Sequence, residues 1–382
     1  AARGALEEGR LNYRQAAAHY ATAAATVPSK SPEKWGYLLK QAGTLARQGE
    51  EFGDNHAFQD AIDLYQQVLT LRDRGKYPLE WAMIQNSLGA ALGSFGARIS
   101  NLQFMEASVA ASRAALEERT RNRVPLDWAT SQNNLGNALS RLGTLTSNKE
   151  LLEAAAAAFR AALQERSRDR VLLDWAATQN NLGNVLLAQD ELEHDIDHLE
   201  EAVDAFLAVL RERIRERAPL NWASTLNNLG NALLILGERK HDTECLEEAA
   251  RAYRISLQVL TRKRLPLKWA GTLNNLGIAL KEIGESKSDT AILRKAIAAY
   301  SGALKVRTRQ QFPLDWAQTQ CNMGKALASM GDIKSDTLLL EKASEALHAS
   351  IEVLSVHAPL PQLQSAQRYL AHVENLLNKM GK

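Results

Sequence analysis

The chain has 382 residues and nearly balanced charge, with 46 Lys and Arg against 44 Asp and Glu, which argues against attachment to nucleic acid or a membrane by bulk charge. Its only two cysteines, Cys245 and Cys321, exclude a disulfide framework and favour a reducing, cytoplasmic compartment. The sequence shows neither a signal peptide nor an apolar run long enough to cross a bilayer.

The first 28 residues carry small and aromatic side chains at spacings typical of a helical repeat: Gly4, Gly9, Tyr13, Ala16, Tyr20, Ala23 and Pro28. In order and spacing they resemble the second half of a tetratricopeptide (TPR) unit. The first half of that unit's leading helix is missing, and the chain does not begin with Met. Either the natural protein begins irregularly or the chain was cut within a repeat, and we favour the cut. We therefore expect a domain over residues 1–30 with an uncovered edge, through which two copies form a dimer.

A longer repeat begins at Ser31. Six tryptophans recur at intervals of 47 residues, and a seventh, Trp35, lies 46 residues before the first of them: Trp81, Trp128, Trp175, Trp222, Trp269 and Trp316. A fixed period in this range predicts a solenoid. The same spacing continues to Leu363, where the Trp is lost. We expect an array of seven long TPR-like repeats over residues 31–359 and a C-terminal capping helix over 360–382, with fraying after about Leu377.

Each repeat is predicted to hold two helices, shown by the copy that starts at Pro125. At about 100° per residue, one apolar stripe of the leading helix (126–142) contains Trp128, Leu135, Leu139 and Leu142. Each Trp should be largely buried between its own repeat and the preceding one. Gly136 flanks the stripe and lets a neighbouring helix come close, and Leu142-Gly143 should end the helix. A second helix is expected over residues 151–168, and later copies carry Asp242, Asp289 and Asp336 as N-caps.

The Asn-Asn-Leu core of the leading helices resembles the TPR variant of kinesin light chains. This resemblance implies an all-α, right-handed superhelical solenoid of antiparallel helix pairs. The unit is 47 residues long, whereas the common TPR has 34. The third long repeat departs from the pattern, because Leu172 replaces the usual Pro and its connector, residues 188–197, lacks the usual Gly.

Paired asparagines form the first candidate site, and a second row follows three residues after the second Asn of the pair. The pairs are Asn133/Asn134, Asn180/Asn181, Asn227/Asn228 and Asn274/Asn275, and the second row is Asn137, Asn184 and Asn231. The TPR resemblance implies that the leading helices line a concave groove, where carboxamides can bind a peptide backbone without reading its sequence. The alternative is that one Asn of each pair bonds the neighbouring repeat. We expect the first Asn and the second row to point further from the Trp stripe and to be the better ligand candidates.

Two other patterns have weaker support. Arginines cluster where second helices end, and stacked repeats would align them along one edge that could bind phosphates: 119–123, 166–170, 211–217, 262–264 and 305–309. The other interpretation is that they complement helix ends and pair with Asp127, Asp174 or Asp315, because no aromatic residues are expected between them. His194 and His198 could share a metal, but no third ligand supports this, and we expect no metal site.

The sequence contains no Gly-rich phosphate loop, nucleophile elbow or His-Glu-x-x-His motif, so we predict that the chain is not an enzyme and uses no cofactor. The leading hypothesis is a scaffold that binds a protein or peptide in the concave groove. Two alternatives stay open. One is the sensor or regulatory region of a larger bacterial signalling or defence protein with an upstream effector domain. The other is nucleic-acid binding along the Arg edge.

Overall fold

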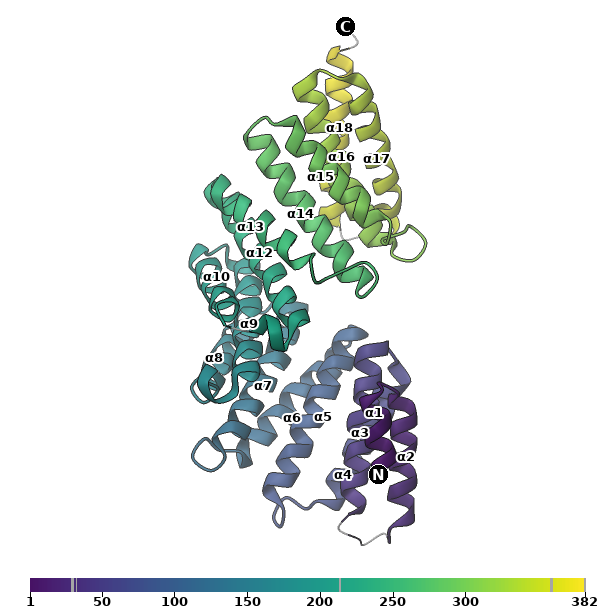
Figure 1. Ribbon diagram of the computed structural model, residues 1–382, viewed down its shortest axis with the longest axis vertical. Helices are drawn as coiled ribbons and strands as arrows, with labels where there is room; N and C mark the ends of the chain where they lie inside the picture. Colours follow the sequence, from purple (N-terminus) through teal and green to yellow (C-terminus); the bar gives the residue numbers. More distant parts are fainter. Residues whose placement is uncertain (29–30, 32, 213, 358–359, 381–382) are drawn as a thin grey trace. The chain divides into compact units, whose positions relative to one another are not determined.

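The computed structural model describes residues 1–28, 31, 33–212, 214–357 and 360–380, and all regular secondary structure in this part of the chain is helical (Figure 1). The chain divides into two compact units, Ala1–Asp195 and Ile196–Lys382. The domain limits predicted at residues 30 and 359, and Arg213 of the predicted Arg edge, lie outside the described residues. Within each unit, consecutive helices pair and the pairs stack, so the predicted all-α solenoid is confirmed.

Unit 1 contains leading helices that each pack against the trailing helix after them and against the next leading helix. The pairs are α1 with α2, α3 with α4, α5 with α6 and α7 with α8, and α9 follows (Figure 1). Their bounds are α1 Ala2–Gly9, α2 Tyr13–Thr26, α3 Lys34–Phe52, α4 Asn55–Leu71, α5 Pro78–Arg98, α6 Leu102–Glu118, α7 Pro125–Thr146, α8 Lys149–Leu163 and α9 Arg168–Glu193.

Unit 2 repeats this arrangement. The leading helices α12, α14 and α16 pair with α13, α15 and α17, while α18 packs against α16 and α17. The bounds are α10 Ile196–Leu210, α11 Ile214–Arg217, α12 Pro219–Lys240, α13 Thr243–Ser256, α14 Pro266–Ser286, α15 Thr290–Leu304, α16 Pro313–Lys334, α17 Thr337–His357 and α18 Leu360–Met380. α18 continues past Leu377 to Met380, and Leu376, Leu377 and Met380 pack on the apolar cluster of α16–α18.

Local signals explain where the helices begin. Proline occupies the first turn of α5, α7, α12, α14 and α16, where its missing N–H costs nothing. The predicted N-caps are confirmed, since a carboxylate oxygen of each of Asp242, Asp289 and Asp336 accepts from a backbone N–H of the first turn. In the repeat without Pro, Val171 still adopts φ −143° and ψ 65°, close to the values of Val124 before α7. The repeat therefore keeps its backbone break when Leu172 replaces Pro.

Two glycines of each regular leading helix lie where the trailing helix crosses it. A Cβ atom on Gly136 would lie 2.7 Å from the Phe159 ring, and one on Gly143 would lie 2.9 Å from Leu152 Cδ2. The predicted close approach at Gly136 is confirmed. The predicted helix end at Gly143 is wrong: α7 continues to Thr146 and ends at Ser147, whose φ is 49°. Gly143 lies inside the helix, and we attribute the recurrence of glycine at this place in the repeat to close packing of the trailing helix.

The trailing helices are shorter than predicted, and arginines contribute to covering the tryptophans. α8 ends at Leu163, because the chain then turns and places Arg166 in the interior. All seven indole side chains are half-buried, with most of each ring surface covered, which agrees with the prediction of largely buried tryptophans. Arginine guanidinium groups from the preceding connector cover part of several of these rings. Arg74 lies 4.8 Å from the ring centroid of Trp81, and Arg121 lies 5.6 Å from that of Trp128.

Candidate functional site

The first Asn of each pair connects neighbouring leading helices. Asn133 on α7 is 8 % exposed, and its Oδ1 accepts from Thr178 Oγ1 and Asn181 Nδ2 of α9, each at 3.2 Å. In unit 2, Asn274 on α14 is 6 % exposed and accepts from Asn322 Nδ2 of α16 at 3.2 Å. Asn227 on α12 accepts from Thr272 Oγ1 of α14 at 2.9 Å. These acceptors hold the stack in register, as buried polar groups require partners.

This geometry corrects the predicted roles within each pair. We expected the first Asn to point away from the packed face, yet Asn133 and Asn274 are buried between leading helices. The second Asn of the pair supplies the donor from the following repeat, as Asn181 and Asn322 do. Both members therefore take part in stacking, and the second members retain more exposed surface than the first members Asn133 and Asn274.

The second row of amides is divided between packing and exposure. Asn231 Oδ1 accepts from Tyr253 Oη at 2.8 Å and from Asn275 Nδ2 at 2.9 Å, so it connects α12 to both α13 and α14. Asn137 is half-buried and Asn184 is exposed. The other predicted site residues that keep accessible surface are all half-buried: Asn134, Asn180, Asn181, Asn227, Asn228 and Asn275.

Two arginines that begin clusters of the predicted edge are buried inside the stack. Arg119 and Arg166 are each 6 % exposed. Arg166 bridges two leading helices, donating from Nη1 to Thr178 Oγ1 at 2.8 Å and from Nη2 to Thr130 Oγ1 at 3.0 Å. Arg307 likewise donates to Thr319 Oγ1 at 3.2 Å. Burial lowers the pKa of the Arg119, Arg166 and Arg307 guanidinium groups from its ordinary value, while the aspartate eight residues later in the chain opposes this.

A second arginine row contacts tryptophan rings and glutamates of the next repeat. Besides Arg74 and Arg121, Arg309 lies 5.5 Å from the Trp316 ring centroid. Arg74 Nε pairs with Glu118 at 2.6 Å, and Arg121 Nε pairs with Glu165 at 2.6 Å. The expectation that no aromatic residues accompany the arginines was wrong. The signal was present in the sequence, since Trp81, Trp128 and Trp316 each follow such an arginine by seven residues.

The two histidines considered as metal ligands, His194 and His198, lie in different parts of the fold. His194 adopts φ 55° and ends α9, whereas His198 belongs to α10 in the other unit. Throughout the residues that the structure describes, no three His, Cys, Asp or Glu side chains gather as metal ligands. Of the helices described, none combines the length and the apolar character needed to cross a membrane.

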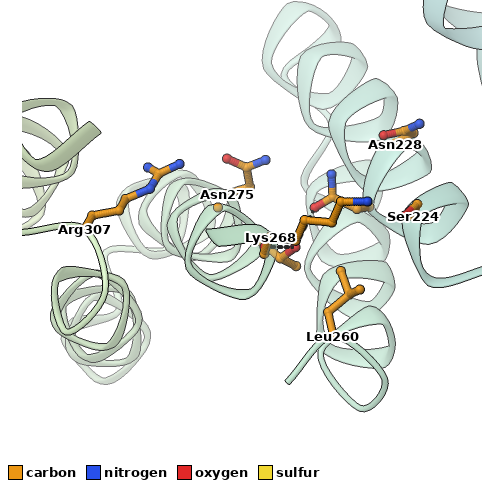
Figure 2. A pocket seen from close by; sticks show the side chains of 9 residues that line it. Ser224, Asn228, Leu260, Lys268, Asn275 and Arg307 are labelled. Carbon is orange, nitrogen blue, oxygen red and sulfur yellow. Dashed lines mark hydrogen bonds between the residues drawn. The ribbon is translucent and has the colours of Figure 1, made fainter. Parts of the chain in front are cut away.

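A pocket of about 310 Å³ opens between α12 and α14 in unit 2 (Figure 2). Figure 2 shows Arg307 and Lys268 on either side of Asn275, with Asn228 and Ser224 extending from the neighbouring helix. The pocket is lined by Ser224, Asn227, Asn228, Leu260, Lys268, Gly271, Thr272, Asn275 and Arg307. Two cations, three amides and two hydroxyls thus surround it, and none of the nine lining residues is acidic.

The 47-residue period agrees with the comparison to family models. Residues 128–169, 175–210 and 222–258 match the family model described as tetratricopeptide repeat. These are tetratricopeptide repeats. Among curated proteins, none matches this chain.

Several solved structures share this fold at low sequence identity. BtubC (BKLC) from P. vanneervenii is 19 % identical, covers 67 % of this chain and 94 % of its own, and has a TM-score of 0.45. The apo form of RapI is 10 % identical over 99 % of this chain and 97 % of its own, with a TM-score of 0.52. A Rap protein complexed with competence and sporulation factor is 11 % identical over 100 % and 99 %, with a TM-score of 0.50. At these identities, the likeness concerns the fold.

Proposed function

We propose that this TPR chain binds an extended segment of a protein partner across its leading helices. The observation that carries the proposal is the recurrence of partly exposed amides, every 47 residues, beside buried amides that already hold the stack. In unit 1 these partly exposed amides include Asn134, Asn137 and Asn181, and in unit 2 they include Asn228 and Asn275. A carboxamide both donates and accepts, so such a row suits the alternating N–H and C=O groups of a peptide backbone.

The buried amides and the partly exposed amides would have different roles, the first in stacking and the second in binding. The buried oxygens of Asn133 and Asn274 fix the spacing of successive leading helices through Asn181 and Asn322. The amides with more exposed surface are thereby presented at intervals set by the stack. Preorganisation of this kind reduces the entropy lost on binding. The same arrangement also suits the sensor region of a longer protein, and the Rap protein crystallised with competence and sporulation factor supports a ligand-binding role for the fold.

Nucleic-acid binding along the Arg edge is not proposed. Arg119 and Arg166 are buried, and Arg74 and Arg121 are engaged by tryptophan rings and glutamates. Releasing them to phosphates would break the contacts between repeats. These four arginines are therefore accounted for by packing.

A displayed random-peptide library can test the proposal. Peptides selected on the wild-type chain would be measured against the Asn134→Ala/Asn137→Ala variant, with Glu153→Ala on the exposed face of α8 as the control. Two lost backbone hydrogen bonds, each worth about 0.5–1.5 kcal/mol, should weaken binding about 5- to 150-fold. Glu153→Ala should leave the affinity unchanged. Selected peptides that bind both variants and the wild type equally would contradict a site on the leading helices of unit 1.

A further inference from the structure

One repeat of unit 2 lacks both members of an arginine–acid pair that several other repeats carry, while the copy before it has Asn221 in place of the acid. Counting by 47 residues, Arg119, Arg166, Leu260 and Arg307 occupy the same place, as does Arg72 in the first complete copy. Eight residues later, the acid of the same repeat follows at Glu80, Asp127, Asp174 and Asp315, but Lys268 follows Leu260. The pairs Arg72–Glu80 and Arg307–Asp315 lie at 3.1 and 3.3 Å, and Arg119–Asp127 at 4.0 Å. Only at 260 and 268, among these described copies, is the arginine lost and the acid replaced by a base.

The pocket between α12 and α14 lies where the missing guanidinium would be. In the repeat with Arg166, the guanidinium fills the space between the hydroxyls of Thr130 and Thr178 on successive leading helices. Adding two repeat lengths to these positions gives Leu260, Ser224 and Thr272, which are three of the residues that line the 310 Å³ pocket. Leucine is too short to reach the two hydroxyls. The pocket is thus the place of an internal arginine that this repeat does not supply.

The charge around the pocket is positive. Lys268 is exposed and, within the part of the chain that the structure describes, has no carboxylate at ion-pair distance. Arg307 lines the opposite side, although its Nη2 already pairs with Asp315. Figure 2 shows these two cations on either side of Asn275. A cationic ligand would be repelled here, whereas an anion would gain Lys268 as a partner.

We propose that this pocket binds a carboxylate from an acidic side chain of the partner segment. The ligand's carboxylate takes the place that the guanidinium occupies in other repeats, and Lys268 takes the place of their acid. The Ser224 hydroxyl would then donate to the carboxylate, whereas the Thr272 hydroxyl already donates to Asn227 Oδ1. This inference rests on the proposed binding of a protein segment and gives that segment an acidic residue opposite α12–α14.

Two peptides that differ by one functional group provide the test. We would titrate the full chain with fluorescent acetyl-Gly-Ala-Glu-Ala-Gly amide and with its Gln counterpart, and would follow backbone NMR signals of the pocket residues. The Glu peptide should bind at least about 10-fold more tightly than the Gln peptide, as expected for one charge-assisted contact. Free glutarate serves as the small-molecule comparison and should bind more weakly than the Glu peptide.

A double substitution restores the arrangement of the other repeats. Leu260→Arg/Lys268→Asp should fold with an internal ion pair, fill the pocket and lower affinity for the Glu peptide at least about 10-fold, to that of the Gln peptide. Lys263→Ala, which removes an exposed lysine of the same connector, should leave affinity unchanged. The reciprocal change in unit 1, Arg166→Leu/Asp174→Lys, should create a second site for the Glu peptide. Circular dichroism and the thermal midpoint verify that each variant is folded.

Three results would overturn the pocket proposal without removing the wider one. If the Glu and Gln peptides bind equally, or if Leu260→Arg/Lys268→Asp binds the Glu peptide as tightly as the wild type, the pocket takes no carboxylate. If glutarate binds as tightly as the Glu peptide, the ligand is a small carboxylate, and the assignment of the carboxylate to a partner's side chain is wrong. Library peptides that depend on Asn134 and Asn137 would still support segment binding in all these cases. If the library peptides do not depend on Asn134 and Asn137 while the Glu peptide still binds at the pocket, the proposed role of the exposed amides is wrong and the pocket proposal stands.

Discussion

Asn133 carries one of the buried acceptors on which the stacking of leading helices depends. Replacing it with Ala leaves Asn181 Nδ2 without its acceptor and removes one of those available to the Thr178 hydroxyl. We expect Asn133→Ala to lower the free energy of unfolding by about 1–3 kcal/mol, the cost of an unsatisfied buried group. Urea unfolding followed by circular dichroism measures the change.

Asn137→Ala is the matched control, because Asn137 lies one helical turn further along α7 and is half-buried. It should change the free energy of unfolding by no more than about 0.5 kcal/mol, as is usual for surface substitutions. Equal destabilisation by the two substitutions would show that the amide network does not distinguish them.

Gly143 tests whether the glycines of the leading helices serve packing. A Cβ atom there would lie 2.9 Å from Leu152 Cδ2 and 3.2 Å from the backbone oxygen of Asn148. Gly143→Ala should therefore destabilise the chain by about 1–3 kcal/mol, despite the higher helix propensity of Ala. At Gly43 the nearest atom is the Tyr65 hydroxyl at 3.6 Å, so Gly43→Ala should stabilise by up to about 1 kcal/mol. Thermal unfolding of both variants would decide, and a stabilised Gly143→Ala would refute the packing role.

The sequence alone could place residues on a helical face but could not say which neighbour covers that face. Counting 100° per residue separated Trp128 from Asn133, and this favoured a buried Trp and an accessible Asn. In the structure, the next leading helix packs over Asn133, while Arg121 covers the half-buried Trp128. These contacts join residues about one repeat apart or across a connector. Single-helix periodicity carries no information about them.

At the scale of the element, the repeat period predicted helix pairs correctly and their ends less well. The glycine at 143 indicated a helix end, because Gly often follows a helix, yet here it marks a crossing. The true end repeats at intervals of 47 residues as a left-handed residue that is almost never Gly: Gly53, Ser100, Ser147, His194, His241, Ser288 and Ser335. Sequence reading missed it because serine and histidine do not signal positive φ. His194 occupies this position, where it ends α9.

The left-handed helix end gives a prediction at this scale. Ser147 has φ 49°, a conformation that costs a non-glycine residue roughly 1–2 kcal/mol. Glycine avoids this cost, but part of the gain is lost because glycine gives up more conformational freedom when the chain folds. Ser147→Gly should raise the free energy of unfolding by about 0.5–1 kcal/mol, as other cap optimisations do. Ser140→Gly, in the middle of α7, should lower it by about 0.5 kcal/mol. Urea midpoints that shift in the same direction for both variants would disprove the cap explanation.

At the scale of the whole chain, the arginines are a part of the fold that composition does not reveal. Forty-six basic residues against 44 acidic ones give a formal net charge of +2. Buried arginines join leading helices through Thr130, Ser131, Thr178 and Thr319, and exposed ones join repeats through glutamates. A stack of near-identical repeats depends on such nearest-neighbour contacts, because no single core spans the array. The repeat with Leu260 stands out only when this role of the arginines is known.

Because these arginines are engaged, the chain should bind duplex DNA poorly. Phosphate contacts need free Lys or Arg, and each contact steepens the salt dependence of binding. A fluorescent 20-base-pair duplex titrated with the chain should show a dissociation constant weaker than about 100 µM at physiological salt, the weak end of non-specific binding. Arg74→Ala/Arg121→Ala should lower the thermal midpoint, through lost contacts with Trp81, Trp128 and the glutamates, and leave the anisotropy unchanged. Tight binding with a steep salt slope, lost in that variant while its thermal midpoint is unchanged, would mean that the arginine row serves a nucleic acid.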